Sequence, residues 1–355
     1  MQLGLSENLS ALVARRFIAA KEGGHLVFSS THLSIINAAG ISYQLRYCPA
    51  LAKKPINSAA KPPATPSPKT PKPDPFADPS PDLLVAQFPP SHPTHALVLN
   101  KFPVIPNHFI LATKEWRPQT DLLEKDDLEA TYECLRAWPA HNHNPEGRLF
   151  AFFNSGDESG ASQPHRHLQF LPVEAMQQQP ECEGWNPLID QFSSSSPSQS
   201  HSNNSAPLTL HQFPIAAYAL PLPSNPSPDT LFSIYQTLYR AAVAATQGRD
   251  AHQGPTTPPP TTGSSMISYN LALTLSTMMI CPRRHETATV PIDLDAAADI
   301  LDSGVVSLNG TILAGTLMVK AESEWDALRA NPEYLTKALE RIGFPRADPR
   351  GLSYL

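Results

Sequence analysis

Two histidines and a glutamine occupy every second position in the stretch HRHLQ, at His165, His167 and Gln169. On a β-strand, successive side chains alternate between the two faces, so these three would project together and could meet one ligand. A neutral imidazole nitrogen has a lone pair suited to attack at phosphorus. The spacing therefore favours covalent transfer of a nucleotidyl group to one histidine, with the other histidine in support and the amide of Gln169 bonding phosphate oxygens.

The loop before this stretch, SGDESGASQP, contains Gly156, Gly160 and several other small residues. Small residues allow backbone N–H groups to approach and surround phosphate oxygens, as in other anion-binding nests. An anion-binding loop directly before a nucleophile is a sensible arrangement for phosphoryl chemistry. The glycine-rich loop alone would be weak evidence, but the loop followed by H-x-H-x-Q is much more specific.

Two other interpretations of the histidines stay open at this point. Two histidines on a strand can be ligands of a zinc ion, although no third ligand is evident nearby in the sequence. They can also be structural polar residues at the surface of a sheet.

The elements that would position these residues are mainly strands, followed by helices. Apolar or alternating runs predict strands at 41–47, 83–88, 95–105, 108–114, 149–156, 165–173, 268–284 and 305–320. Helical spacing of apolar residues predicts helices at 6–22, 124–138 and 229–247, and two short ones within 322–343. Because strands and helices are segregated, we predict an α+β fold with a histidine-triad-like antiparallel sheet flanked by helices.

Composition indicates a folded body interrupted by low-complexity inserts. The chain has 355 residues, of which 39 are proline and only 16% are charged. The proline- and serine-rich segments at about 55–81, 193–206 and 254–265 are typical of surface loops. We predict a single domain over 1–355 that carries these three inserts.

Charge and hydropathy exclude several classes of protein. The net charge is −6, and no block of Lys and Arg stands out, so we do not expect duplex nucleic acid as a partner. The N-terminal stretch lacks both a signal-peptide core and a membrane-length apolar run, so we expect no membrane partner. The four cysteines are far apart and form no C-x-x-C motif, so we expect reduced thiols. There is no classical phosphate-binding G-x-x-x-x-G-K-[ST] fingerprint.

The stretch NSGDESGASQPHRHLQF resembles the active-site signature of the fungal ATP adenylyltransferases, also called diadenosine tetraphosphate phosphorylases. These enzymes belong to the histidine-triad superfamily, alongside galactose-1-phosphate uridylyltransferase. The segments YCPALAKKP, LNKFPVIPNHFILATKEW, SYNLALTL through PRR, and AGTLMVK are similar to family blocks in the same order. The resemblance spans most of the chain outside the inserts.

The resemblance implies a two-step exchange at His167, which would attack an α-phosphorus and form an adenylyl-histidine. Phosphate or ADP would then remove the AMP, so that diadenosine tetraphosphate and phosphate give ATP and ADP, or the reverse. His165 and Gln169 would complete the catalytic set. In hydrolytic histidine-triad proteins the position of Gln169 is a histidine, so the glutamine favours transfer over hydrolysis.

The resemblance also implies a set of substrate contacts. They are Lys54, Asn100, Lys101, Asn154, Gly160, Ala161, Ser162, Gln163, Asn309, Gly310, Thr311 and Lys320. Lys53 is the alternative to Lys54, and Lys101 could instead be a solvated strand end. SLNGTIL, which contains residues 309–311, departs from the family pattern. Arg283 and Arg284 are interpreted equally as basic surface or as polyphosphate contacts.

We therefore expect an enzyme whose partners are small nucleotides, working as a monomer in the cytoplasm, or also in the nucleus. A divalent cation such as Mg²⁺ is expected as a counter-ion of the substrate, with no protein-bound cofactor or metal. The alternatives are a histidine-triad nucleotide hydrolase and a non-enzymatic nucleotide-binding protein.

Overall fold

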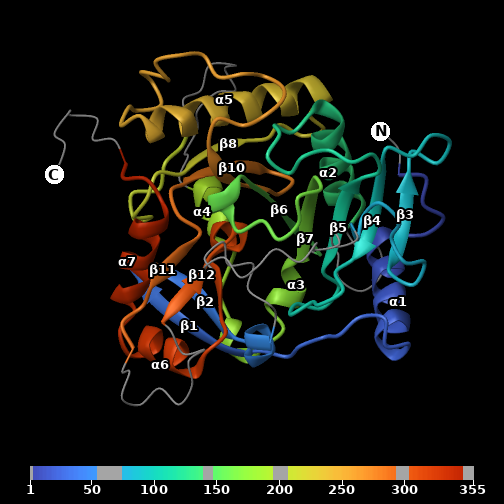
Figure 1. The fold of residues 1–355 in the computed structure, drawn as a ribbon, viewed down its shortest axis with the longest axis horizontal. Helices are drawn as coiled ribbons and strands as arrows, with labels where there is room; N and C mark the ends of the chain where they lie inside the picture. Colours follow the sequence, from blue (N-terminus) through green and yellow to red (C-terminus); the bar gives the residue numbers. More distant parts are fainter. Residues whose placement is uncertain (1–2, 54–73, 139–146, 195–206, 293–303, 347–355) are drawn as a thin grey trace, which may run out of the picture.

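The computed structural model describes residues 3–53, 74–138, 147–194, 207–292 and 304–346. It has an α+β architecture in which helices and two small sheets surround one large antiparallel sheet (Figure 1). The predicted fold class is confirmed.

The large sheet has eight strands in the order β3-β4-β5-β7-β6-β9-β10-β8. Every neighbouring pair is antiparallel. The strands are β3 (Leu84–Phe88), β4 (His95–Leu99), β5 (Phe109–Thr113), β6 (Leu149–Ser155), β7 (His167–Pro172), β8 (Tyr218–Pro221), β9 (Ser268–Leu273) and β10 (Thr277–Arg283). All of these strands except β8 lie within runs that predicted strands; β8 was not predicted, and the run 95–105 forms a strand only as far as Leu99.

Two small sheets accompany the large one. The first has the order β1-β2-β13, with β1 (His32–Ala38) antiparallel and β13 (Thr316–Val319) parallel to β2 (Ile41–Tyr47). The second pairs β11 (Thr287–Thr289) with β12 (Val305–Ser307). The bounds of β2 agree with the strand predicted from its alternating pattern.

Helices cover both faces of the large sheet. They are α1 (Leu9–Glu22), α2 (Lys125–Ala137), α3 (Val173–Met176), α4 (Leu188–Ser194), α5 (Pro228–Thr246), α6 (Glu322–Ala330) and α7 (Glu333–Ile342). Short 3-10 helices are η1 (Pro49–Lys53), η2 (Asp157–Ser159), η3 (Pro180–Cys182) and η4 (Gly310–Ala314). The first helix begins later than predicted, because Asn8 rather than Ser6 caps it by accepting a hydrogen bond from the Ser10 N–H.

The large sheet separates two hydrophobic cores, since neighbouring side chains on a central strand point to opposite faces. Phe153 packs in the core that includes α1, α2 and α5, whereas Phe152 packs in the core that includes β2, β13, η4 and α7. All seven residues of β6 are buried, as expected for a strand covered on both sides. On β7, Leu168 belongs to the first core and Leu171 to the second.

The predicted inserts fall partly outside the described residues. Of the segment 55–81, residues 74–81 are described, and Phe76 there is 5% exposed, so this end is not the solvated loop that its composition predicted. Most of the segment 193–206 lies outside the described ranges. Residues 254–265 form a largely exposed loop without helix or strand. The proposal of one domain stays a prediction.

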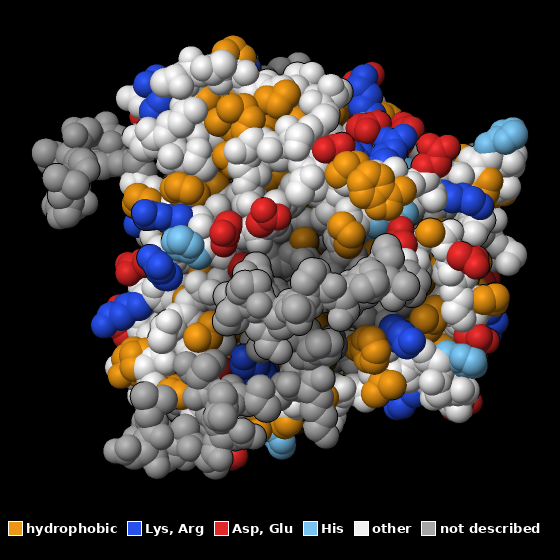
Figure 2. Space-filling view, viewed as in Figure 1, with side chains coloured by type: hydrophobic (Ala, Val, Ile, Leu, Met, Phe, Trp, Pro, Cys, Tyr) orange, Lys and Arg blue, Asp and Glu red, His pale blue; other side chains and the backbone are white. Residues whose placement is uncertain are grey.

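Two further predictions concern thiols and membranes. Cys48, Cys134, Cys182 and Cys281 are free and buried. Within the described ranges, no helix is both long and apolar enough to cross a membrane. On the face seen in Figure 2, Lys and Arg side chains are scattered among acidic ones.

Candidate active site

The histidine strand lies in the middle of the large sheet, between β5 and β6. β7 begins at His167, and a single bridge between His165 and Pro118 extends the strand conformation by two residues. By alternation, His165, His167 and Gln169 share the face that carries the second core, while Arg166 and Leu168 face the first. The structure thus brings the predicted catalytic set to one face.

His167 has the geometry of a neutral nucleophile. Its Nδ1–H donates to the His165 backbone carbonyl at 2.8 Å, which leaves the lone pair of the imidazole on Nε2. The side chain is 2% exposed. Burial lowers the pKa of the His167 imidazole to about 4, so the ring is uncharged at neutral pH.

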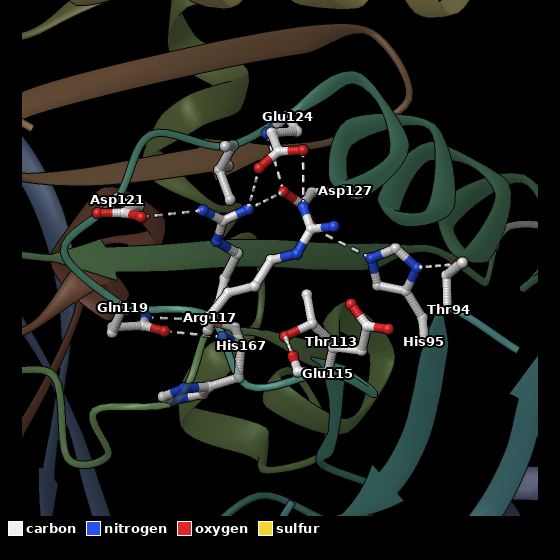
Figure 3. Close-up of polar contacts among 12 residues, drawn as sticks. Thr94, His95, Thr113, Glu115, Arg117, Gln119, Asp121, Glu124, Asp127 and His167 are labelled. Carbon is white, nitrogen blue, oxygen red and sulfur yellow. Dashed lines mark hydrogen bonds and ion pairs between the residues drawn. The ribbon is translucent and has the colours of Figure 1, made fainter. Parts of the chain in front are cut away.

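Gln119 fixes the backbone of His167. Its Oε1 accepts the His167 N–H at 2.7 Å, and its Nε2 donates to the carbonyls of Asn154 at 2.7 Å and His167 at 3.1 Å (Figure 3). The pairing of β6 with β7 ends at Phe152–Gln169, where the two strands diverge. Beyond that pair, the Gln119 side chain supplies hydrogen bonds to both backbones in place of the missing strand pairing. No sequence pattern indicates this role, because Gln119 lies 48 residues before His167 in a loop.

Gln169 belongs to a polar relay that reaches the predicted Asn100. Its Oε1 accepts from His108 Nε2 at 3.1 Å, and His108 Nδ1 accepts from Asn100 Nδ2 at 2.9 Å. The carbonyl oxygen of the amide is thereby occupied, so its NH₂ group can point toward an anion. His108 was not identified from the sequence, although it lies within the family block that contains PNHF.

The glycine loop is built against two other predicted segments. Gly156 and Gly160 have positive φ values of +87° and +77°. A Cβ atom on Gly160 would lie 2.8 Å from Asn309 Cβ, so the loop contacts the Asn309 region directly. Asn154 Oδ1 accepts from the Gly310 N–H at 2.9 Å, which joins β6 to the start of η4.

Arg283 is buried, so its interpretation as basic surface is wrong, whereas a polyphosphate contact stays a prediction. It is 2% exposed, and it donates to Asn270 Oδ1 at 2.6 Å and to the carbonyl of Leu308 at 2.8 Å. Asn270 in turn donates to Asn154 Oδ1 at 2.9 Å. Burial lowers the pKa of Arg283 to about 10. The arginine therefore organises the Asn154 region from within, whereas its neighbour Arg284 is exposed.

The remaining predicted contacts are less fixed by their surroundings. Lys101 is exposed, with Nζ 5.8 Å from the centre of the Phe102 ring. Lys320 follows β13, which pairs with the end of β2 just before η1. Thr311 is the second residue of η4, and its N–H donates to Asn309 Oδ1 at 3.0 Å. Ala161, Ser162 and Gln163 connect Gly160 to the histidine strand, and Lys54 lies outside the described residues.

A buried ionic cluster holds the opposite face of the histidine strand. Arg166, 2% exposed, lies 2.9 Å from Asp127 Oδ2 and 3.2 Å from Glu124 Oε1, while His95 Nε2 lies 3.0 Å from Asp127 Oδ1. Figure 3 shows Glu124 and Asp127 together on one side, with the His167 ring pointing to the other. Burial alone would raise the pKa of Asp127, but the His95 hydrogen bond and the Arg166 charge outweigh it and lower that pKa. The cluster ties β7 to the first turn of α2.

Metal ligation was the alternative use of the histidines. Among the residues whose positions are described, no group of three His, Cys, Asp or Glu side chains is placed to hold a metal ion. The Nδ1 atom of His167 is engaged with a backbone carbonyl.

Known proteins are similar to this chain over almost its whole length. The family model "Ap4A phosphorylase N-terminal domain", where Ap4A is diadenosine tetraphosphate, matches residues 2–189, and "ATP adenylyltransferase C-terminal domain" matches residues 211–345. The chain is 27% identical to diadenosine 5',5'''-P1,P4-tetraphosphate phosphorylase 2 of Saccharomyces cerevisiae, over 96% of each chain. It is 26% identical to Protein APA1 of the same yeast, over 97% of this chain and 96% of that one. The crystal structure of yeast Ap4A phosphorylase Apa2 in complex with Ap4A is similar, with a TM-score of 0.74, 26% identity, and coverage of 97% of this chain and 100% of that one.

Proposed function

As a member of the family of Ap4A phosphorylases and ATP adenylyltransferases, this chain is a nucleotidyltransferase acting on Ap4A, and we propose that it transfers the adenylyl group through His167. The net reaction converts Ap4A and phosphate into ATP and ADP, or the reverse. The observation that carries the proposal is the fixed, uncharged His167 imidazole beside the glycine loop.

In the first step, His167 Nε2 attacks one α-phosphorus of Ap4A. The new P–N bond forms as the bond from that phosphorus to its bridging oxygen breaks, and ATP leaves with the electron pair. The ring then carries positive charge, which the His165 carbonyl stabilises through the Nδ1–H hydrogen bond. In the second step, a phosphate oxygen attacks the same phosphorus, the P–N bond breaks, and ADP leaves with the imidazole neutral again.

The surroundings support transfer to phosphate in preference to water. Gln169 is neutral, so it cannot act as a general base toward water in the way that a third histidine could. The NH₂ group of Gln169 and the backbone of the glycine loop can supply hydrogen-bond donors for phosphate oxygens. We propose Lys54, Lys101 and Lys320 as the cations that offset the charge of the polyphosphate.

The substrate enters as a nucleotide–Mg²⁺ complex in this proposal, with the cation as counter-ion of the polyphosphate. The protein then needs no resident metal. We also propose that one chain suffices for the reaction, because the catalytic set and the glycine loop all come from the same chain.

Product analysis tests the proposed mechanism. The wild type should convert Ap4A into ATP and ADP only when phosphate is present, and His167→Ala should lose this activity. The matched control His92→Ala removes an exposed histidine and should keep it. Release of AMP without phosphate would show hydrolysis instead, and an active His167→Ala enzyme would contradict the assignment of the nucleophile.

A further inference from the structure

A short segment after the proline-rich insert returns to the histidine pair. Asp74 Oδ2 lies 2.6 Å from His165 Nδ1. The ring of Phe76, two residues later, lies 5.1 Å from the His167 ring and 5.8 Å from the His165 ring, centre to centre. Both contacts cross more than 85 residues of sequence, so they depend on the tertiary structure alone.

The turn that delivers the carboxylate is itself held by that carboxylate. Asp74 Oδ1 accepts the Phe76 N–H at 2.9 Å, while Oδ2 is left for His165. Phe76 is 5% exposed and packs against the histidine rings, which seats the turn. The two carboxylate oxygens therefore have separate tasks.

Both ring nitrogens of His165 have a polar partner. Thr113 Oγ1, which donates to the carbonyl of Glu115 at 2.8 Å, lies 3.0 Å from His165 Nε2. The other nitrogen, Nδ1, faces the carboxylate of Asp74. The ring is therefore held from both sides.

The buried His165 ring needs polar partners for its nitrogens. The His165 side chain is 1% exposed, and a buried polar group is costly unless it is hydrogen-bonded. Among the described residues, Asp74 is the carboxylate that lies against this ring, and its side chain is 27% exposed. Asp74 therefore supplies the polar partner of Nδ1 at the edge of the site.

The pair bears on catalysis through the backbone of His165. The ring is held on one side by Thr113 and on the other by Asp74, which fixes the residue whose carbonyl accepts the Nδ1–H of His167. Loss of the carboxylate would remove one of these two anchors.

We propose that Asp74 is a positioning residue for adenylyl transfer, which acts through His165 to hold the His167 imidazole in its attacking orientation. The inference rests on the proposed role of His167 as the nucleophile. It gives a function to a residue of the segment 55–81, which its composition alone predicts to be a solvated insert.

The substitution Asp74→Asn tests this inference, because it keeps the side-chain oxygen that accepts the Phe76 N–H and removes the charge. The measurement is the single-turnover rate of adenylyl-enzyme formation at saturating Ap4A. We expect a loss of about 10- to 100-fold, the usual effect of removing an outer partner of a reacting side chain. The matched control Asp78→Asn, exposed in the same segment, should keep the wild-type rate.

A double-mutant cycle separates positioning from a general loss of structure. If Asp74 acts through His165, Asp74→Asn should lower the rate of a His165→Asn enzyme by less than about threefold, because the partner is already absent. The inference is overturned if Asp74→Asn matches Asp78→Asn, or if its full effect persists in the His165→Asn background. A wild-type enzyme that acquires no AMP on His167 would instead refute the proposed function.

Discussion

Arg166 gives a sharp test of how the histidine strand is held in place. Replacing it with methionine keeps an unbranched side chain of similar length but leaves Asp127, which is 1% exposed, without its guanidinium partner. Breaking a buried ion pair by removing one member costs about 3–5 kcal/mol, because the remaining charge stays buried. Arg166→Met should therefore destabilise the protein by roughly 4 kcal/mol.

The matched control is Arg117→Met. Arg117 pairs with Glu124 at 2.6 Å in the same cluster, but their side chains are 38% and 46% exposed. An exposed pair contributes about 1 kcal/mol or less, so this variant should lose at most that much. The contrast between the two arginines depends on burial, since both are bound to carboxylates of the α2 N-terminus.

Urea and thermal unfolding measure the difference. The entropy of unfolding is about 2.1 cal/mol/K per residue, or roughly 0.6 kcal/mol/K for the roughly 300 described residues. A loss of about 4 kcal/mol then lowers the Tm by roughly 6 °C, against about 1–2 °C for the control. Because the folded pKa of Asp127 is lowered, its contribution is present above its unfolded pKa of about 3.9 and is lost as the pH falls through the folded value. Equal losses for the two variants at pH 7 would refute this account of the cluster.

Two further predictions concern the nucleophile and the loop. Burial lowers the pKa of His167 from its ordinary value of 6.5 to about 4. The rate of adenylyl-enzyme formation, measured by rapid quench, should therefore stay constant from about pH 8 to 5 and fall only as the pH passes about 4. A pH profile of this rate with a midpoint near 6.5 would contradict the prediction. Gly160→Ala should raise the KM for Ap4A about tenfold, because its φ of +77° and its Cβ contact of 2.8 Å with Asn309 together cost at least about 1.4 kcal/mol. Gly263→Ala, at the same φ but with nothing within 4 Å, is the control, and an equal effect on KM would show that loop contact is irrelevant.

Features that depend on local pattern could be predicted from the sequence. The alternation in ISYQLRY predicts the strand β2, and helical spacing predicts α5 within one residue at each end. The H-x-H-x-Q spacing also predicts that both histidines share one face, since His165 extends the conformation of β7 through its bridge to Pro118 and strand alternation is a property of the backbone itself. The first residue of α1 is harder to predict from the sequence. Ser6 and Asn8 are both suitable N-caps, and only Asn8 accepts the capping hydrogen bond.

Features that depend on distant contacts could not be predicted in this way. Gln119 and His108 are ordinary polar residues in the sequence, and only the arrangement of β5, β6 and β7 shows that they bond to His167 and Gln169. The sequence around Arg283 is compatible with an exposed cation, but the structure places its guanidinium against a buried backbone carbonyl. Asp74 lies in a segment whose proline content indicates a solvated loop, because composition carries no information on what a turn packs against.

The central claim is that the AMP is carried by one atom of one residue, Nε2 of His167. The direct measurement is to mix the enzyme with Ap4A in the absence of phosphate, quench in alkali, which preserves a phosphoramidate, and locate the added AMP by peptide mass spectrometry. The account predicts one AMP on the peptide that contains His167, removed as ADP when phosphate is added before the quench. An AMP found on any other residue, or an active wild type that never carries AMP, would contradict it.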